Sequence, residues 1–193
     1  MNWKEIFEYL GLGAFILWSL FERGFSLMNQ QQNQGRKNSK ISFFLISLFW
    51  YGIMAYAIVD IWGIQLTTFT QLLWGLRVVG VALSAAGLVI RFIARRDLGK
   101  QYSVHLETSD KHHLITEGIY STLRHPAYLG LLCLFIGIPL SFGSWGSLAI
   151  AVAGGMPAVV YRISLEELAL REWFGKKYQA YRQNSWHLLP YIW

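Results

Sequence analysis

Charged side chains are scarce in this chain of 193 residues, in which Asp, Glu, Lys and Arg together make up only 15%. Soluble globular domains contain about 25% of them, whereas here 54% of the residues are hydrophobic and 16% are aromatic. This shortage of charge and a mean hydropathy of +0.33 indicate a membrane protein. One compact membrane domain is the simplest organisation for this length.

Cysteine is nearly absent as well, and the motifs of common soluble enzymes are missing. The single Cys133 lies in an apolar run, so it has no intrachain disulfide partner and no CxxC partner for a metal. Gly11-Leu12-Gly13 is only a GxG inside another apolar run, and neither a P-loop nor a GxSxG motif occurs. The sequence therefore argues against disulfide-stabilised, P-loop and serine-hydrolase classes.

The excess of basic residues, a net charge of +6, does not indicate a nucleic-acid partner. These residues stand between the apolar runs, where anionic lipid headgroups explain them better than a nucleic acid does. We therefore expect these basic residues to interact with a membrane and not with a nucleic acid.

Five apolar runs dominate the sequence, and each is a candidate for a membrane-spanning helix. They cover residues 6–21, 43–59, 72–93, 127–142 and 145–160. A cleaved signal peptide is the alternative for the first run. Against it, positive charge follows the run and no small-residue cleavage pattern appears before Phe25.

Small residues and prolines predict how these helices are shaped. The third run carries Gly75, Gly80, Ser84 and Gly87, whose spacing would let a neighbouring helix approach closely. Pro139 and Pro157 predict kinks in the last two spans. Beyond them, the charged tail from Arg162 onward predicts a helix outside the bilayer, broken or bent near Gly175.

Lysine and arginine alternate between the connections of this five-span arrangement. The first and third connections and the C-terminal tail carry several of them, whereas 60–71 and 141–144 carry none. The positive-inside rule then predicts an outside N-terminus and a cytoplasmic C-terminus. Both large polar segments, 95–124 and 162–193, fall on the cytoplasmic side and can form one site.

The first of these segments leads into KHHLITEGIYSTLRHPAYLG, residues 111–130. Gly118 to Tyr120 predicts a turn, and Pro126 suits the first turn of the fourth helix, where it loses no helical hydrogen bond. His125 would then lie at a helix N-terminus, where backbone N–H groups favour an anion. The alternative is a histidine that only caps the helix.

Two arginines are expected at the membrane boundary. Arg162 and Glu166 share a helix face and could form a simple ion pair, but Arg162 directly follows an apolar run. Ionisable residues at such a depth commonly have functional partners. Arg91 lies at the matching depth of the third span, where the alternative is a snorkelling arginine that binds lipid phosphate.

Histidines offer no convincing metal site. His105, His112 and His113 precede the fourth span, but their spacing matches no strong ligand motif. We therefore expect no metal.

Three motifs together resemble a known family. They are HxLITEGIYxxxRHPxYxG, then Arg162-xxx-Glu166-Glu167, then Phe174-Gly175-xx-Tyr178-xx-Tyr181. The combination resembles the isoprenylcysteine carboxyl methyltransferase family and, more distantly, membrane phospholipid N-methyltransferases, from about Gly87 to Pro190. The resemblance implies methyl transfer from S-adenosylmethionine at the cytoplasmic membrane face.

We accordingly expect an all-α integral membrane protein with five transmembrane helices. Its cytoplasmic cofactor pocket would be built from the loop before the fourth helix and the C-terminal helical tail. Residues 1–71 carry no specific signal and are interpreted as a two-helix membrane anchor, and 72–193 as the catalytic region.

The resemblance also implies site residues, position by position. The cofactor contacts would be His112, His113, Leu114, Ile115, Tyr120, His125, Pro126, Ala127, Tyr128 and Glu166, with Glu167 as an alternative acidic member. Arg162, Arg91 and Glu167 are assigned to catalysis, the two arginines on the acceptor side. His105 stands where the carboxyl methyltransferases have a glutamine that contacts the cofactor, so its role stays open.

The chemistry of these residues agrees with the resemblance. Tyr120 and Tyr128 could offer ring faces to the sulfonium, and a glutamate could accept hydrogen bonds from the ammonium or the ribose. A carboxylate acceptor is already ionised and needs orientation by arginine, whereas an amine acceptor needs a base. Arg91 and Arg162 favour the carboxylate of a lipid-like or prenylated acceptor. Lipid amine N-methylation and a non-catalytic lipid-binding or scaffold protein are the alternatives.

Overall fold

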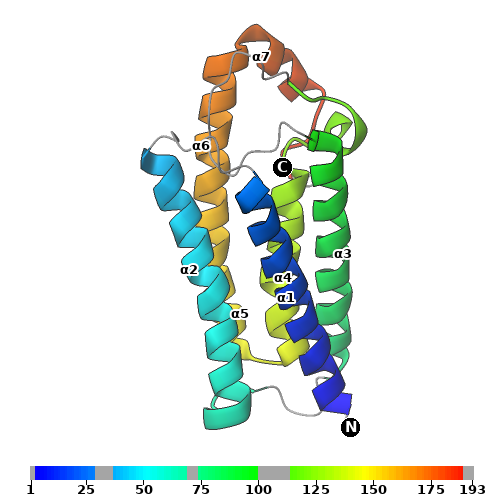
Figure 1. Ribbon diagram of the computed structural model, residues 1–193, viewed down its shortest axis with the longest axis vertical. Coiled ribbons are helices and arrows are strands. Elements are labelled where there is room, and N and C mark those ends of the chain that lie inside the picture. The colour runs from blue at the N-terminus through cyan, green and yellow to red at the C-terminus, as the bar shows by residue number, and fades with distance from the viewer. Residues whose placement is uncertain (1–2, 29–36, 69–73, 100–113, 189–193) are drawn as a thin grey trace.

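Long helices dominate the computed structural model, which describes residues 3–28, 37–68, 74–99 and 114–188. Within these ranges the secondary structure is helical apart from two isolated bridges. The elements are α1 (Trp3–Met28), α2 (Lys37–Val59), η1 (Asp60–Ile64), α3 (Trp74–Leu98), η4 (Gly118–Ser121), α4 (Pro126–Phe142), α5 (Trp145–Ile150), η5 (Ala151–Gly155), α6 (Met156–Phe174) and α7 (Lys176–Gln183). The all-helical prediction is confirmed, and the described part of each predicted span lies in a long helix (Figure 1).

Three described helices are long and apolar enough to cross a bilayer: Asn38–Ile64, Trp74–Leu98 and Trp145–Phe174. Helix α4 is also apolar but has only 17 residues. Large apolar side chains such as Leu17, Phe44 and Phe92 are exposed on the bundle, as expected where lipid covers the surface. An integral membrane protein follows from these features, whereas five spans and the orientation of the termini stay predictions.

The last long helix does not end where its apolar run ends. Helix α6 continues past Arg162 to Phe174 without a break, because no glycine or proline interrupts it there. The predicted break at Gly175 is confirmed: this residue has φ +50° and separates α6 from α7. The charged residues up to Phe174 therefore belong to the same helix as the apolar residues before Arg162.

The two prolines for which kinks are predicted lie in different helical surroundings. Pro139 lies inside α4, whereas Pro157 follows the π-helical turn η5. Pro157 has no N–H to donate to the carbonyl of Ala153, four residues earlier. A wider π turn at this position accommodates the missing bond within one continuous helix.

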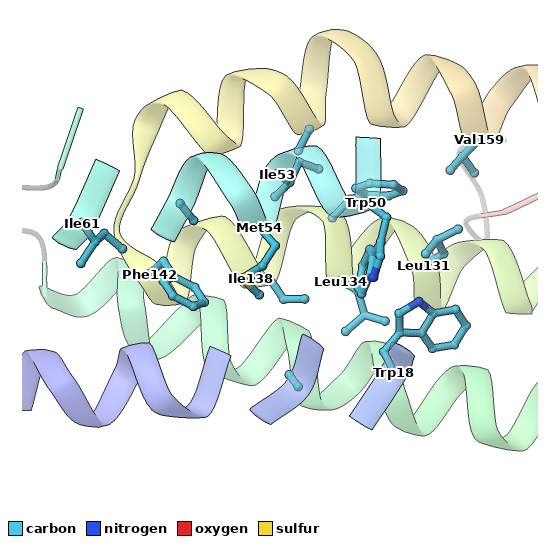
Figure 2. Close-up of a cluster of buried hydrophobic side chains, with 14 of the residues drawn as sticks. Trp18, Trp50, Ile53, Met54, Ile61, Leu131, Leu134, Ile138, Phe142 and Val159 are labelled. Carbon is cyan, nitrogen blue, oxygen red and sulfur yellow. The ribbon is translucent and has the colours of Figure 1, made fainter. Parts of the chain in front are cut away.

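Aromatic side chains from three helices meet in the core. Trp50 of α2 stacks on Phe15 of α1 with ring centroids 5.2 Å apart, and packs edge-on against Phe135 of α4 at 5.7 Å. Trp18 completes this cluster (Figure 2). Helices α1 and α2 are therefore packed into the same core as α4.

Glycines bring α3 and α4 into close contact, as the small residues of α3 predict. A Cβ added to Gly137 would lie 2.7 Å from the Gly80 carbonyl oxygen, and one on Gly130 would lie 2.7 Å from the Gly87 carbonyl oxygen. The prediction is confirmed for Gly80, Ser84 and Gly87. It is wrong for Gly75, where an added Cβ meets no described atom within 4 Å.

Gly137→Ala is expected to destabilise the protein by about 1–3 kcal/mol, because the new methyl overlaps the α3 backbone and cannot be relieved by a side-chain movement. Thermal unfolding in detergent measures the effect. Gly52→Ala is the matched control, since a Cβ at this position in α2 meets nothing described within 4 Å. Equal melting temperatures for both variants would contradict the close contact.

Candidate functional site

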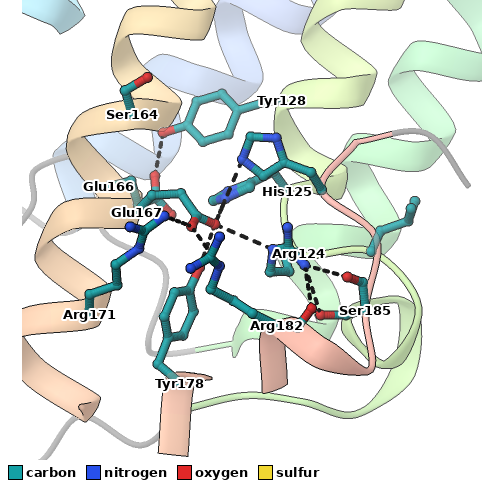
Figure 3. Close-up of polar contacts among 12 residues, drawn as sticks. Arg124, His125, Tyr128, Ser164, Glu166, Glu167, Arg171, Tyr178, Arg182 and Ser185 are labelled. Carbon is teal, nitrogen blue, oxygen red and sulfur yellow. Dashed lines mark hydrogen bonds and ion pairs between the residues drawn. The ribbon is translucent and has the colours of Figure 1, made fainter. Parts of the chain in front are cut away.

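A buried carboxylate, Glu167, is the centre of a polar cluster at one end of the bundle. It lies on α6, and its side chain is 7% exposed. His125 Nε2 lies 2.9 Å from Glu167 Oε1, and the Tyr178 hydroxyl of α7 donates to the same oxygen at 2.5 Å. Residues from the start of α4, from α6 and from α7 therefore converge on one acidic group (Figure 3).

Arginines surround the same carboxylate. Arg124 Nε lies 3.4 Å from Oε1, while Arg171 Nη2 and Arg182 Nε lie 3.4 and 3.5 Å from Oε2. Three guanidinium groups around one carboxylate leave local positive charge, which favours an anionic ligand group.

The C-terminal tail is joined to the loop before α4 by backbone bonds. Arg124 N donates to Trp186 O at 2.8 Å, and Trp186 N donates to Thr122 O at 2.8 Å. The Arg124 side chain also donates to the carbonyl oxygens of Ser185 and Arg182. The fold thus brings the two polar segments together, as the topology suggested.

Local geometry fixes the start of α4. Gly118 has φ +60° in the turn η4, and the Asp97 carboxylate accepts from Ile119 N at 3.0 Å. Pro126 begins α4, as predicted, with His125 at the N-cap. The His125 side chain makes no capping hydrogen bond but contacts Glu167, so the interpretation of His125 as only a cap is wrong.

A second polar chain starts from Arg162, which is 3% exposed. Its Nε donates to the Tyr128 hydroxyl at 3.2 Å, and that hydroxyl donates to Glu166 Oε2 at 2.6 Å. Tyr128 therefore bridges the two groups that the helix spacing predicted as a pair. The ring centroids of Tyr128 and His125 lie 5.9 Å apart. This contact connects the hydrogen-bonded series from Arg162 to the Glu167 cluster.

Arg91 lies on α3 and contacts both the start of α4 and the end of α1. Its Nη1 donates to Ala127 O at 2.6 Å and its Nη2 donates to Glu22 Oε2 at 3.1 Å, while the guanidinium stacks over Trp18 at 3.8 Å. Arg95 Nη2 lies 2.5 Å from the same Glu22 oxygen, Oε2. Arg91 is 5% exposed, so it is not a snorkelling arginine.

An open pocket of about 510 Å³ lies against the Glu167 cluster. Its lining residues are Arg124, Ser164, Glu167, Leu168, Arg171, Arg182 and His187. Burial, reinforced by neighbouring His125, lowers the pKa of His187 to about 4, so this imidazole is neutral at pH 7. The pocket has the size of a small-molecule site.

The predicted cofactor residues divide into three groups. His125, Pro126, Ala127, Tyr128 and Glu166 lie together around the start of α4 and the facing part of α6. Tyr120 is buried in η4, where its carbonyl accepts from the Tyr181 hydroxyl at 2.6 Å, and Leu114 and Ile115 are half-buried before it. His112, His113 and His105 lie outside the described residues.

Sequence reasoning missed several partners. Glu22, Ser39, Ser42 and His187 contact predicted site residues, although no motif marks them. Tyr178 belongs to the third family motif but had no predicted role, and its hydroxyl donates a hydrogen bond to Glu167.

A metal site is geometrically possible but electrostatically poor. Ligand atoms of His125, Glu167 and His187 lie within 4.8 Å of one another. The arginines already engage both oxygens of the carboxylate, and their positive charge opposes a cation. We assign no metal, and its absence stays a prediction.

The cluster fits S-adenosylmethionine better. The pocket-lining guanidinium groups suit the carboxylate of this molecule. Of the residues predicted for the cofactor, Glu167 lines the pocket, whereas Tyr120, His125, Tyr128 and Glu166 are not among its lining residues. The pocket is large enough for a ligand of this size.

Comparison with known proteins gives consistent matches. The phospholipid methyltransferase family matches residues 76–177. A probable protein-S-isoprenylcysteine O-methyltransferase of Oryza sativa subsp. japonica is 30% identical over 165 residues, which cover 82% of this chain and 84% of the relative. The protein-S-isoprenylcysteine O-methyltransferase of Xenopus laevis is 32% identical over 124 residues, 63% of this chain and 43% of the relative.

A solved structure of the eukaryotic intramembrane Ras methyltransferase, an isoprenylcysteine carboxyl methyltransferase, is also similar. It superposes with a TM-score of 0.53 at 26% identity, over 80% of this chain and 50% of that chain. The present chain thus spans half of that protein.

Proposed function

The chain belongs to the phospholipid methyltransferase and isoprenylcysteine O-methyltransferase family, and from this premise we propose that it transfers a methyl group from S-adenosylmethionine to the carboxylate of a lipid-like or prenylated acceptor. One observation carries the choice of a carboxylate. Arg162 is buried at the edge of an apolar helix run and linked through Tyr128 to the His125 and Glu167 cluster. A fixed guanidinium at that place suits an ionised headgroup.

The chain's own residues position the reactants in this proposal. The arginines around Glu167 would hold the cofactor carboxylate, Glu166 would accept from its ammonium, and Arg162 would orient the acceptor carboxylate. When bound, S-adenosylmethionine would supply the methyl group of its sulfonium: the acceptor carboxylate oxygen would gain the O–CH₃ bond as the S–CH₃ bond breaks, and no proton would have to move. Alignment of two reactants by fixed groups supplies much of the rate of such a reaction.

The membrane arrangement is part of the same proposal. The five long helices cross the bilayer with the N-terminus outside and the C-terminus cytoplasmic, and the site lies at the cytoplasmic face. The alternation of Lys and Arg between the connections supports this orientation. An acceptor would arrive from the bilayer between apolar helices, and the polar cofactor from water.

The test is methyl transfer by purified protein in detergent or nanodiscs. With labelled S-adenosylmethionine and a farnesylated cysteine carboxylate, we expect a base-labile methyl ester as the product. The same acceptor with its carboxylate already esterified is the control and should take no label. Absence of both cofactor binding and methyl transfer would contradict the proposal, and base-stable label on phosphatidylethanolamine vesicles would favour lipid amine N-methylation instead.

A further inference from the structure

Two serines at the start of α2 hold the Arg162 guanidinium. Arg162 Nη1 donates to Ser39 Oγ at 2.7 Å, to Ser39 O at 3.1 Å and to Ser42 Oγ at 3.1 Å. These contacts join residues about 120 positions apart in the sequence. Helix α2, which looks like a plain anchor in the sequence, thus reaches the acceptor side of the candidate site.

Both serines are buried, so their contacts with Arg162 are not incidental contacts at the surface. Ser39 and Ser42 are 1% and 0% exposed, and their three-residue spacing places them on one helix face. The Ser42 hydroxyl donates to Ser39 O at 2.9 Å, which leaves its oxygen lone pairs directed to the arginine. Since buried hydroxyls need partners, this network fixes the position of Nη1.

The groups that hold Arg162 differ in chemistry from the group that holds the other boundary arginines. Arg91 and Arg95 are held by the Glu22 carboxylate, at 3.1 and 2.5 Å, which offsets their charge. The two α2 serines are neutral and set the direction of the Arg162 guanidinium by hydrogen bonds, while the Glu166 carboxylate is linked to Arg162 through the Tyr128 hydroxyl.

We propose that Ser39 and Ser42 are positioning residues for the acceptor carboxylate, acting through Arg162. This inference rests on the proposed function. Helix α2 then forms one wall of the acceptor site and takes part in selecting an anionic headgroup.

The experiment compares Ser39→Ala/Ser42→Ala with the wild-type protein in the ester-forming assay. The proposal predicts that KM for the carboxylate acceptor rises about 10- to 100-fold, as expected for lost hydrogen bonds to a charged group. Affinity for S-adenosylmethionine should stay unchanged. The single Ser42→Ala variant should show a smaller rise, and Ser42→Thr, which keeps a hydroxyl, should restore most of the wild-type value.

Ser47→Ala is the matched control, because Ser47 lies on the same helix and its hydroxyl donates only locally, to Phe43 O at 2.9 Å. Competition by the neutral methyl-ester product provides a second readout. Its inhibition constant should not change in the double variant, since a neutral ester does not require the guanidinium, whereas a structural collapse would weaken the acid and the ester alike.

The results separate the two proposals. Ester formation by the wild type with an unchanged acceptor KM in the double variant, or equal losses for acid and ester, would overturn the role of the serines while the proposed function stands. Absence of ester formation by the wild type would overturn both.

Discussion

Glu167→Gln is expected to lower the stability of the protein by about 3 kcal/mol and to weaken cofactor binding at least about tenfold, because removal of one partner leaves buried cations uncompensated. Most of this loss comes from the buried Arg124 guanidinium, and the rest from weaker hydrogen bonds of His125 and Tyr178 to a neutral amide. Arg171 is 46% exposed and contributes little through a screened contact. Thermal unfolding and titration with S-adenosylmethionine measure the two effects.

Glu172→Gln is the control for this substitution, because Glu172 lies on the same helix and is exposed. It should change stability by no more than about 0.5 kcal/mol. If the Glu167→Gln variant has the same melting temperature and the same cofactor affinity as the control, Glu167 does not organise the cluster.

Much of the fold follows from local sequence patterns. The apolar runs predict the long helices because each run must satisfy its backbone hydrogen bonds internally in lipid. Gly80 and Gly87 predict the close contact with α4, and Gly175 predicts the end of α6, because only small or glycine residues allow these geometries. Such features depend on neighbours along the chain, so they can be read from it.

The continuation of α6 beyond Arg162 follows from a different pattern than the apolar runs do. A change from apolar to charged residues marks a change of environment, whereas a helix ends only where its backbone is interrupted. The sequence between Arg162 and Phe174 contains good helix formers and no interruption. The change in polarity at Arg162 therefore predicts where the lipid ends better than where the helix ends.

The partners of the site residues could be predicted least. The motifs contain His125, Tyr128, Arg162 and Glu167, but not the groups that hold Arg162 and Arg91. These are Ser39, Ser42 and Glu22, which come from α1 and α2 and are 69 to 123 residues away. Their contacts depend on how α1 and α2 pack in the core, and a serine near the start of a helix carries no signal of such a role.

Replacement of Arg162 should separate the acceptor side of the site from the cofactor side. We expect Arg162→Ala to reduce kcat/KM for the acceptor by about 10²- to 10³-fold. This is the usual effect of removing one preorganised hydrogen-bond donor from an active site. Cofactor affinity should be kept, because the Glu167 cluster remains. Arg162→Lys should recover only part of the activity, since it keeps the charge but not the planar fork that contacts Tyr128 and the α2 serines.

The control for Arg162→Ala is Arg96→Ala, which removes an arginine that is 66% exposed and paired with neighbouring Asp97. This change should leave kcat/KM near the wild-type value. A loss of cofactor binding in Arg162→Ala as large as its loss of turnover would place Arg162 on the cofactor side. Full activity of Arg162→Lys would show that charge alone is sufficient, and the hydrogen-bonded position of the guanidinium would then not determine how the acceptor is oriented.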